Sequence, residues 1–229
     1  MTLVAIAASA VTIAMLISQL TVIKQLKQAH KVPILQFLMS FLSSILWLKY
    51  GLIKHDNTVI FVNGIGSIIS FYILASFWWY STTRSHVEIE VLATAVTGVL
   101  LVSYVDHSRD PMAVEAFSMV CCLMSLVFLA SPLSQIGNVV KLKDASVLLP
   151  SVALLAFANN ILWLVYGYIH QDPFMIFPNI IGALFCALQL VLIAIYGRAA
   201  AGRLPVALED DGVLASSENV QMTEISHGL

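Results

Sequence analysis

Charged residues are scarce in this chain: Lys, Arg, Asp and Glu make up 10% of its 229 residues. A soluble domain carries about 25% charged residues, so this chain has too few to cover a water-facing surface. The net charge is −2, and no basic patch is present that could hold a phosphate backbone. The shortage excludes an ordinary cytosolic enzyme, a nucleic-acid-binding protein and a disordered regulator.

Cysteine is also sparse. Cys121, Cys122 and Cys186 all lie inside apolar runs, so we expect three free thiols rather than a disulfide framework. The sequence has no Walker loop, no metal-ligand cluster and no nucleophile–base pair. We therefore expect no metal, no cofactor and no enzymatic activity.

Long apolar runs fill the chain instead, and hydrophobic residues make up 59% of it. A helix needs about 20 apolar residues to cross the hydrocarbon core of a bilayer. The expected fold class is an all-α integral membrane protein with seven transmembrane helices, the fourth being the shortest. The predicted spans are Leu3–Ile23, Ile34–Ile53, Val59–Tyr80, Val91–Val105, Met112–Leu133, Val147–Tyr168 and Phe174–Tyr196.

The distribution of lysine and arginine predicts the orientation of these spans, because cytoplasmic loops carry the excess of positive charge. One side would hold Lys24, Lys27, Lys31, Arg84, Lys141, Lys143, Arg198 and Arg203, and the other Lys54 and Arg109. We expect the N-terminus outside or in a lumen, the C-terminus in the cytosol, and Lys49 to snorkel outward from its helix end. We expect the plasma membrane, although the Golgi or another endomembrane follows the same rule.

Two stretches of the chain match without a gap, Ile45–Gly66 and Ile161–Gly182, at an offset of 116. Helices 1 and 5 match at an offset of 113. Helices 1–3 therefore repeat as helices 5–7, with helix 4 left between two parallel three-helix units. The predicted domains are residues 1–84 (first three-helix bundle), 85–111 (linker helix with its loops), 112–198 (second bundle) and 199–229 (disordered cytosolic tail).

The polar groups expected inside the membrane are neutral. Ion-driven carriers need an ionisable group at membrane depth, whereas Asn63 and Asn179 occupy matching places in helices 3 and 7. Amides donate and accept together, which suits hydroxyl groups, and Trp47 and Trp163 offer indole faces for the C–H face of a sugar ring. The alternatives stay open: an interhelical hydrogen bond for the asparagines and an interfacial aromatic belt for the tryptophans.

Two further sets of residues could line the same cavity or only pack between helices. They are Thr12, Met15 and Gln19 on one face of helix 1, and their counterparts Ser125, Phe128 and Pro132 on helix 5. For Asn159 and Asn160 in helix 6, whose counterparts are serines, we favour helix packing.

The doubled ILWLxYG…D…xN..G block, the Ala130–Leu133 element ASPL and the three-plus-one-plus-three layout resemble the SWEET sugar transporters over Leu3 to Tyr196. The resemblance implies movement of mono- or disaccharides down their gradient through a central pocket. It implies a substrate site at Asn63, Asn179, Trp163 and Trp47, and an extracellular gate at Tyr50 and Asp172. Homo-oligomers occur in that family, so self-association stays open.

The hinge prolines expected from the resemblance are incomplete here. Pro132 matches and Pro150 is one position out of register, but Gln19 and Gln36 stand where helices 1 and 2 would carry proline. Proline removes a backbone hydrogen bond and permits a kink, whereas glutamine does not. We therefore expect bending to be concentrated in the second half.

The function expected from these features is facilitative, bidirectional transport of a sugar such as glucose by alternating access, in contact with membrane lipid. Large side chains at Met15 and Phe128 favour a monosaccharide. Two alternatives stay open: a proton-coupled carrier of amino acids or another small metabolite, and a seven-helix receptor or scaffold.

Overall fold

A computed structural model describes residues 2–27, 34–81, 84–108, 110, 112–127, 130–146 and 148–201. Every regular element among them is an α-helix. The helices are α1 (Leu3–Gln19), α2 (Val22–Lys27), α3 (Leu35–Lys54), α4 (Asn57–Tyr80), α5 (Arg84–His107), α6 (Met112–Val127), α7 (Ala130–Leu142), α8 (Pro150–Ile169) and α9 (Pro173–Ala201). Phe128 and residues 202–229 of the predicted tail lie outside the described residues.

The described helices have the length and apolar composition of membrane spans. Six helical stretches pass both criteria, and α6 is a shorter apolar helix of the same kind. Leu, Ile, Val and Phe side chains project outward along the bundle, as on Leu92 of α5 and Leu184 of α9, each more than 60% exposed. In water such a surface would be unfavourable, but lipid chains cover it at no cost. The predicted fold class, an all-α integral membrane protein, is confirmed.

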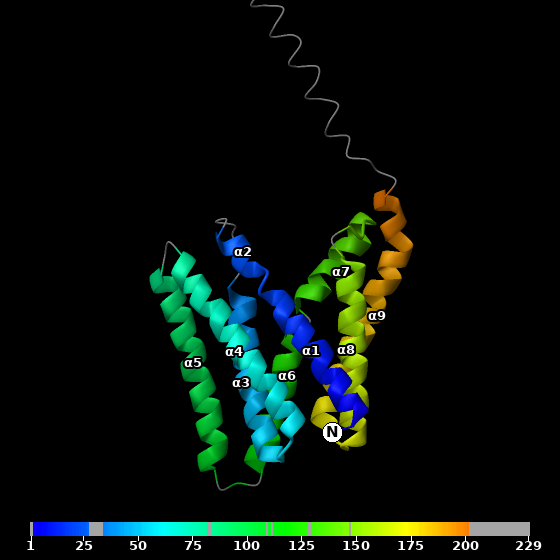
Figure 1. The fold of residues 1–229 in the computed structure, drawn as a ribbon. Helices are drawn as coiled ribbons and strands as arrows, with labels where there is room; N and C mark the ends of the chain where they lie inside the picture. Colours follow the sequence, from blue (N-terminus) through cyan, green and yellow to red (C-terminus); the bar gives the residue numbers. More distant parts are fainter. Residues whose placement is uncertain are drawn as a thin grey trace, which may run out of the picture.

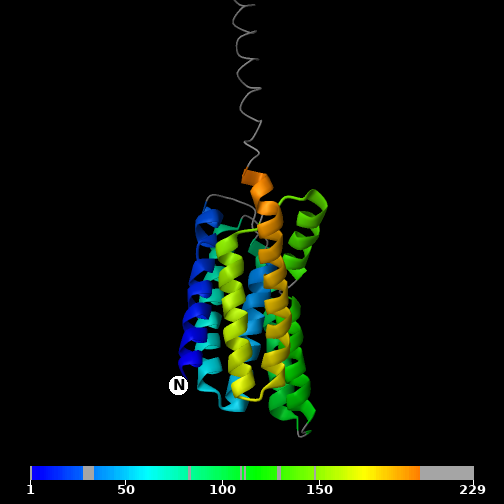
Figure 2. The same cartoon turned by 90° about the vertical axis from the view of Figure 1, so that its right-hand side faces the viewer.

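The helices form two groups with α5 beside the first of them (Figure 1). The first bundle is α1–α4 and the second is α6–α9. They meet along two seams, one between α1 and α8 and the other between α3 and α6. Figure 1 shows the groups converging at one end and diverging toward the end where α9 finishes, and Figure 2 shows the same bundle from the side.

The end where the groups converge carries the α3–α4 and α8–α9 turns, and we call it the short-turn end. Each turn passes through one left-handed residue, His55 (φ 54°) or Gln171 (φ 54°). The backbone N–H of the following aspartate then donates to a glycine carbonyl, Asp56 to Gly51 and Asp172 to Gly167, each at 2.9 Å. These tight turns leave both aspartates between helices, at equivalent positions of the two repeats.

Glycine brings the paired helices of each repeat close together. A Cβ at Gly51 would lie 3.0 Å from the Ile60 backbone nitrogen, and a Cβ at Gly167 would lie 3.0 Å from the Met175 Cβ. Both contacts would be tighter than ordinary van der Waals contact, so α3 packs closely on α4 and α8 on α9. This close packing fixes the asparagine-bearing helices against the tryptophan-bearing ones.

The prediction that helix 4 is the shortest span is wrong. Its counterpart α5 has 24 residues, because the helix continues through Glu88 and Glu90 at one end and Asp106 at the other. The predicted span was an apolar run, so it left out these polar first and last turns. A helix carries such residues readily where it leaves the hydrocarbon core.

Helix 1 is interrupted at Gln19, although it carries no proline there. Gln19 ends α1, and the chain continues through N–H to i−3 carbonyl bonds, Leu20 to Ile17 (3.0 Å) and Thr21 to Ser18 (3.2 Å). The Ser18 and Thr21 hydroxyls also donate to i−3 carbonyls, at 2.6 and 2.8 Å. Such hydroxyl bonds compete with the helical ladder, so helix 1 breaks without proline.

The other predicted hinge residues lie in the first turns of described helices. Gln36 is the second residue of α3, Pro150 the first of α8 and Pro132 the third of α7. Proline fits the first turn of a helix, because the first N–H groups have no intrahelical acceptor. The one proline beyond the first turn of a described helix is the buried Pro178 of α9, which the sequence prediction missed. Which of these positions bends during transport stays a prediction.

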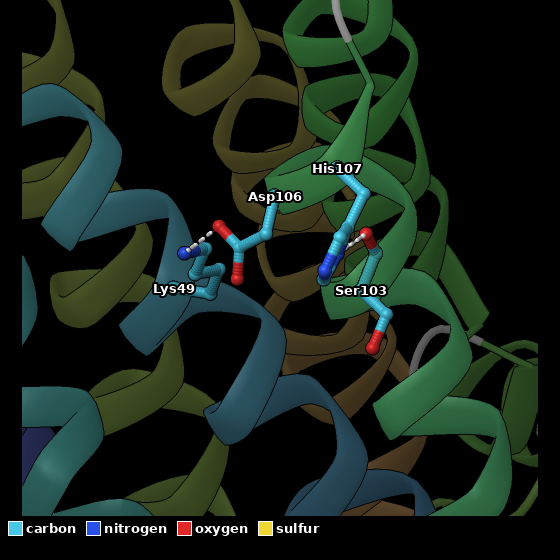
Figure 3. A network of polar contacts seen from close by, with 4 residues as sticks. All are labelled: Lys49, Ser103, Asp106 and His107. Atoms are coloured by element: carbon cyan, nitrogen blue, oxygen red, sulfur yellow. Dashed lines mark hydrogen bonds and ion pairs between the residues drawn. The ribbon is translucent and has the colours of Figure 1, made fainter.

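Lys49 pairs with a carboxylate in the last turn of α5, and its outward snorkelling stays a prediction. Its Nζ forms an ion pair with Asp106 of α5, and next to it His107 Nδ1 lies 3.0 Å from the Ser103 carbonyl oxygen (Figure 3). The repeat counterpart of Lys49 is Val165, which is 39% exposed. The ion pair therefore joins α5 to the first bundle and has no equivalent on the second.

Candidate functional site

A cavity of about 150 Å³ lies between the two bundles. A single water needs only about 10–15 Å³ by a comparable measure, so the cavity can hold a small polar solute. Helices of both repeats supply its walls. The lining residues are Thr12, Trp47, Val59, Val62, Asn63, Ser125, Trp163, Met175 and Asn179.

Six of the eight residues predicted to bind substrate line this one cavity: Asn63, Asn179, Trp47, Trp163, Thr12 and Ser125. Met15 is half-buried and is not among the lining residues. Phe128 lies outside the described residues. The structure therefore brings together the symmetric pairs that the repeat predicts, and Met15 is not one of the residues that line their cavity.

The two asparagines are held in the same way. Asn63 Nδ2 donates to the Val59 carbonyl at 2.9 Å, and Asn179 Nδ2 donates to the Met175 carbonyl at 2.7 Å. Each amide has two N–H donors and one carbonyl acceptor. The i−4 bond uses one donor and orients the side chain, which leaves one donor and the acceptor of each amide for a ligand in the cavity.

The two tryptophans also form matching contacts, and each reaches across a seam. Trp163 Nε1 donates to Thr12 Oγ1 at 2.8 Å, and Trp47 Nε1 donates to Ser125 Oγ at 3.1 Å. Trp163 is only 9% exposed. These partners and this depth favour a cavity wall over the interfacial aromatic belt.

The residues that sequence reasoning missed are partly apolar. Val59, Val62 and Met175 complete the cavity wall, and Val59 and Met175 are repeat counterparts. The signal for them was present in the spacing, because a residue four positions before Asn63 or Asn179 lies on the same helix face. The lining residues of the described cavity carry no formal charge.

Asn159 is a further residue that sequence reasoning assigned only to packing. Its Oδ1 accepts from Thr12 Oγ1 at 2.7 Å, across the α1–α8 seam. Asn159 precedes Trp163 by one helical turn, which was the signal that could have found it. Asn160 does pack as predicted: its Oδ1 would lie 2.1 Å from a Cβ at Gly182.

At the short-turn end, two tyrosine–aspartate hydrogen bonds join the bundles. The predicted gate pair is in contact, with Tyr50 Oη donating to Asp172 Oδ2 at 2.5 Å. The second pair is Tyr166 Oη with Asp56, at 2.8 and 2.9 Å from the two carboxylate oxygens. The second pair was missed, although the repeat superimposes Tyr50 on Tyr166 and Asp56 on Asp172.

The aspartates of these pairs also cap the helices that carry the asparagines. Asp56 Oδ1 accepts from the Thr58 and Val59 N–H groups at the start of α4, and Asp172 Oδ1 accepts from the Phe174 N–H at the start of α9. Such caps stabilise a helix start. The tyrosines stack edge-on against the cavity tryptophans, with centroid distances of 5.1 Å (Trp47–Tyr50) and 5.4 Å (Trp163–Tyr166). The tyrosines of the two tyrosine–aspartate pairs are therefore in direct contact with the tryptophans of the cavity wall.

The solved structure of a eukaryotic SWEET transporter has the same fold. It aligns with a TM-score of 0.78 at 24% sequence identity, covering 85% of this chain and 95% of that one. The likeness supports the arrangement of two bundles and a linker helix described above.

Comparison with known sequences identifies the family. The rice protein "Bidirectional sugar transporter SWEET7b" (Oryza sativa subsp. indica) is 33% identical over 173 residues, 71% of this chain and less than two thirds (64%) of that protein. "Sugar transporter SWEET1" of Drosophila pseudoobscura pseudoobscura is 32% identical over 70% of this chain and 72% of its own, and that of Dictyostelium discoideum 29% over 86% and 93%. A family model described as "Sugar efflux transporter for intercellular exchange" matches residues 2–85 and 115–201, and the chain belongs to this family, the SWEET transporters.

Proposed function

We propose that this protein carries a sugar across a membrane, in either direction and down the sugar's gradient. The observation that carries the proposal is the cavity between the bundles, in which Asn63 and Asn179 face one space from opposite repeats. The printed names of the relatives, which call them sugar transporters, support the same substrate class.

The lining residues suit a polyol. Each asparagine amide has a donor and an acceptor available beyond its i−4 bond, and a sugar hydroxyl both donates and accepts. The indoles of Trp47 and Trp163 offer apolar ring faces together with N–H donors. A sugar in the cavity would exchange bonds to water for bonds to both repeats at once.

Alternating access follows from the position of the cavity between two bundles that are joined at the short-turn end. The bonds Tyr50–Asp172 and Tyr166–Asp56 close that end, and their rupture together with closure of the opposite end would expose the site to the other side. In this proposal residues 1–84 and 112–198 move as bodies around the central site. The short-turn end faces the outside or a lumen, the C-terminus lies in the cytosol, and the plasma membrane is the proposed location.

The proposed transport is uniport. The residues lining the cavity carry no charge, and coupling to protons or ions needs a group that binds them at membrane depth. Such a carrier equilibrates its sugar across the membrane and does not concentrate it.

Flux through purified protein tests the proposal. Liposomes containing the protein should take up radiolabelled glucose until the inside and outside concentrations are equal, and the end point should not depend on an imposed pH gradient. A panel of mono- and disaccharides defines the substrate range. Accumulation that follows the pH gradient would indicate a proton-coupled carrier, and no flux of any sugar would contradict the proposal.

The variant Asn179→Ala tests the site itself. Loss of the amide removes bonds to the sugar but leaves the helix intact, so glucose flux should fall at least about tenfold, the equivalent of 1.4 kcal/mol. Asn160→Ala is the matched control, because Asn160 forms the same i−4 bond (Nδ2 to the Ala156 carbonyl, 2.8 Å) away from the cavity. If Asn179→Ala transports glucose at the wild-type rate, the Asn179 amide does not belong to the sugar site.

A further inference from the structure

The indole–hydroxyl bonds tie the bundles together inside the substrate cavity. Trp163 of α8 bonds to Thr12 of α1, and Trp47 of α3 bonds to Ser125 of α6. All four residues line the cavity. Each bond therefore crosses a seam and, in the same place, occupies a group that a bound ligand could use.

The donors in these bonds cannot serve two partners at full strength. An indole has one N–H and no acceptor, so an N–H bonded to a hydroxyl of the other bundle is withheld from a ligand. Thr12 also bonds onward: its Oγ1 lies 2.7 Å from Asn159 Oδ1 and 2.8 Å from the Ala8 carbonyl. Trp163, Thr12 and Asn159 thus form a short chain of hydrogen bonds. It starts and ends on α8, and Thr12 of α1 is its middle member.

Separating α1 from α8 in an empty carrier breaks this chain and leaves buried polar groups without their partners. A sugar in the cavity changes that balance, because its hydroxyls can accept from the indole N–H and donate to the threonine oxygen. Bonds between the bundles then become bonds between each bundle and the sugar, and the bundles can move apart without losing them.

We propose that the indole–hydroxyl bonds are latches that slow the reorientation of the empty carrier, and that bound sugar releases them. Thr12 and Ser125 are then positioning residues, which act on transport through the two tryptophans. The inference rests on the proposed function and adds a kinetic consequence: exchange of sugar for sugar is faster than net transport, because net transport requires the empty carrier to return.

The expected effect is set by the strength of a hydrogen bond. A typical bond contributes enough to change an equilibrium or a rate about fivefold. Removing the Thr12 hydroxyl should therefore accelerate return of the empty carrier about fivefold relative to the loaded carrier. At saturating glucose, any loss of sugar affinity caused by the same change drops out of the comparison.

The experiment measures two rates in liposomes containing the full-length protein: uptake of radiolabelled glucose into glucose-free vesicles, and uptake into vesicles preloaded with unlabelled glucose. In wild type the second rate should exceed the first. In Thr12→Val, which keeps the shape of the side chain, the ratio should fall toward one, and Thr12→Ser should restore it. Thr94→Val is the matched control, because within the described part of the chain the buried Thr94 hydroxyl bonds only to the Glu90 carbonyl of its own helix, at 2.8 Å.

The outcomes separate the two proposals. A wild-type ratio of one, or a ratio that Thr12→Val leaves unchanged, overturns the latch while the flux itself still supports sugar transport. Absence of flux in wild type overturns the proposed function. If Thr12→Val fails to purify as a monodisperse protein, Ser125→Ala tests the latch at the other seam, where a smaller fall in the ratio is expected and an unchanged ratio contradicts it.

Discussion

The two seams between the bundles are related by the internal repeat but are not equally strong. Along α1–α8, Thr12 accepts from Trp163 at 2.8 Å and lies 2.7 Å from Asn159, so two bonds cross the seam. Along α3–α6, Trp47 reaches Ser125 at 3.1 Å, and the Ser125 hydroxyl turns to the Cys121 carbonyl of its own helix at 3.3 Å. One seam has a chain of three side chains and the other a single bond.

The difference comes from one position. Asn159 has Ser43 as its repeat counterpart, and a serine is too short to take part in an equivalent chain across the other seam. The two copies therefore share the indole–hydroxyl pair and differ at this position, where the α1–α8 seam has the longer side chain. We expect the α1–α8 seam to resist opening more than the α3–α6 seam.

The largest effect is expected at the short-turn end, where both seams close. In Asp56→Ala and Asp172→Ala, each change removes a helix cap, worth about 1 kcal/mol, and the carboxylate partner of a buried tyrosine hydroxyl, costing about 1–3 kcal/mol. Glucose flux should fall at least about tenfold and the thermal midpoint in detergent should drop.

Asp110→Ala provides the control for the gate variants. Asp110 caps α6 through the Met112 N–H at 2.9 Å but is exposed and forms no bond to a tyrosine among the described residues. The variant Asp110→Ala should have a somewhat lower thermal midpoint and an unchanged glucose flux. Equal losses of flux in all three variants would show that capping alone, and not closure of the gate, matters.

An intermediate effect is expected from Asn159→Ser, which gives the stronger seam the residue of the weaker one. Loss of one bond across the seam should lower the ratio of exchange to net uptake by about fivefold. Transport itself should persist. The reciprocal change Ser43→Asn is the companion variant. If Asn159→Ser leaves both rates at their wild-type values, the two seams do not differ in the way their bonds suggest.

The smallest effect is expected from Lys49→Met, which removes the ion pair between α3 and α5. The pair is partly exposed, with side-chain exposures of 20% for Lys49 and 45% for Asp106, and such pairs contribute less than about 1 kcal/mol. The free energy of unfolding should fall slightly and flux should be unchanged. A large loss of flux would instead give α5 a direct part in transport.

Much of the site could be predicted because the repeat doubles every signal. Asn63 and Asn179 are amides in apolar helices, and their matching positions in the two repeats predicted that both contribute to one central site. The same logic should have found Tyr166 and Asp56 once Tyr50 and Asp172 were named. The second pair was missed because only one pair was carried over from the family resemblance.

Other features depend on packing that spacing does not determine. Met15 shares a helix face with Thr12, but a helix face is wider than a cavity wall, and Met15 lies outside the lining. Asn159 and Asn160 are adjacent and differ by about 100° around the helix, so one reaches Thr12 and the other packs on Gly182. The break after Gln19 arises from the serine and threonine hydroxyls beside it, which a search for proline overlooks.

Labelling of cysteines placed on both bundles tests the central claim, a single sugar site shared by the two repeats. Val59→Cys and Met175→Cys put thiols at equivalent positions of the cavity wall, and the wild-type protein, with its three buried cysteines, gives the background. We predict that glucose slows maleimide labelling of both thiols with the same half-maximal concentration, because one bound sugar covers both. Protection of only one thiol, or of neither, would contradict a shared central site.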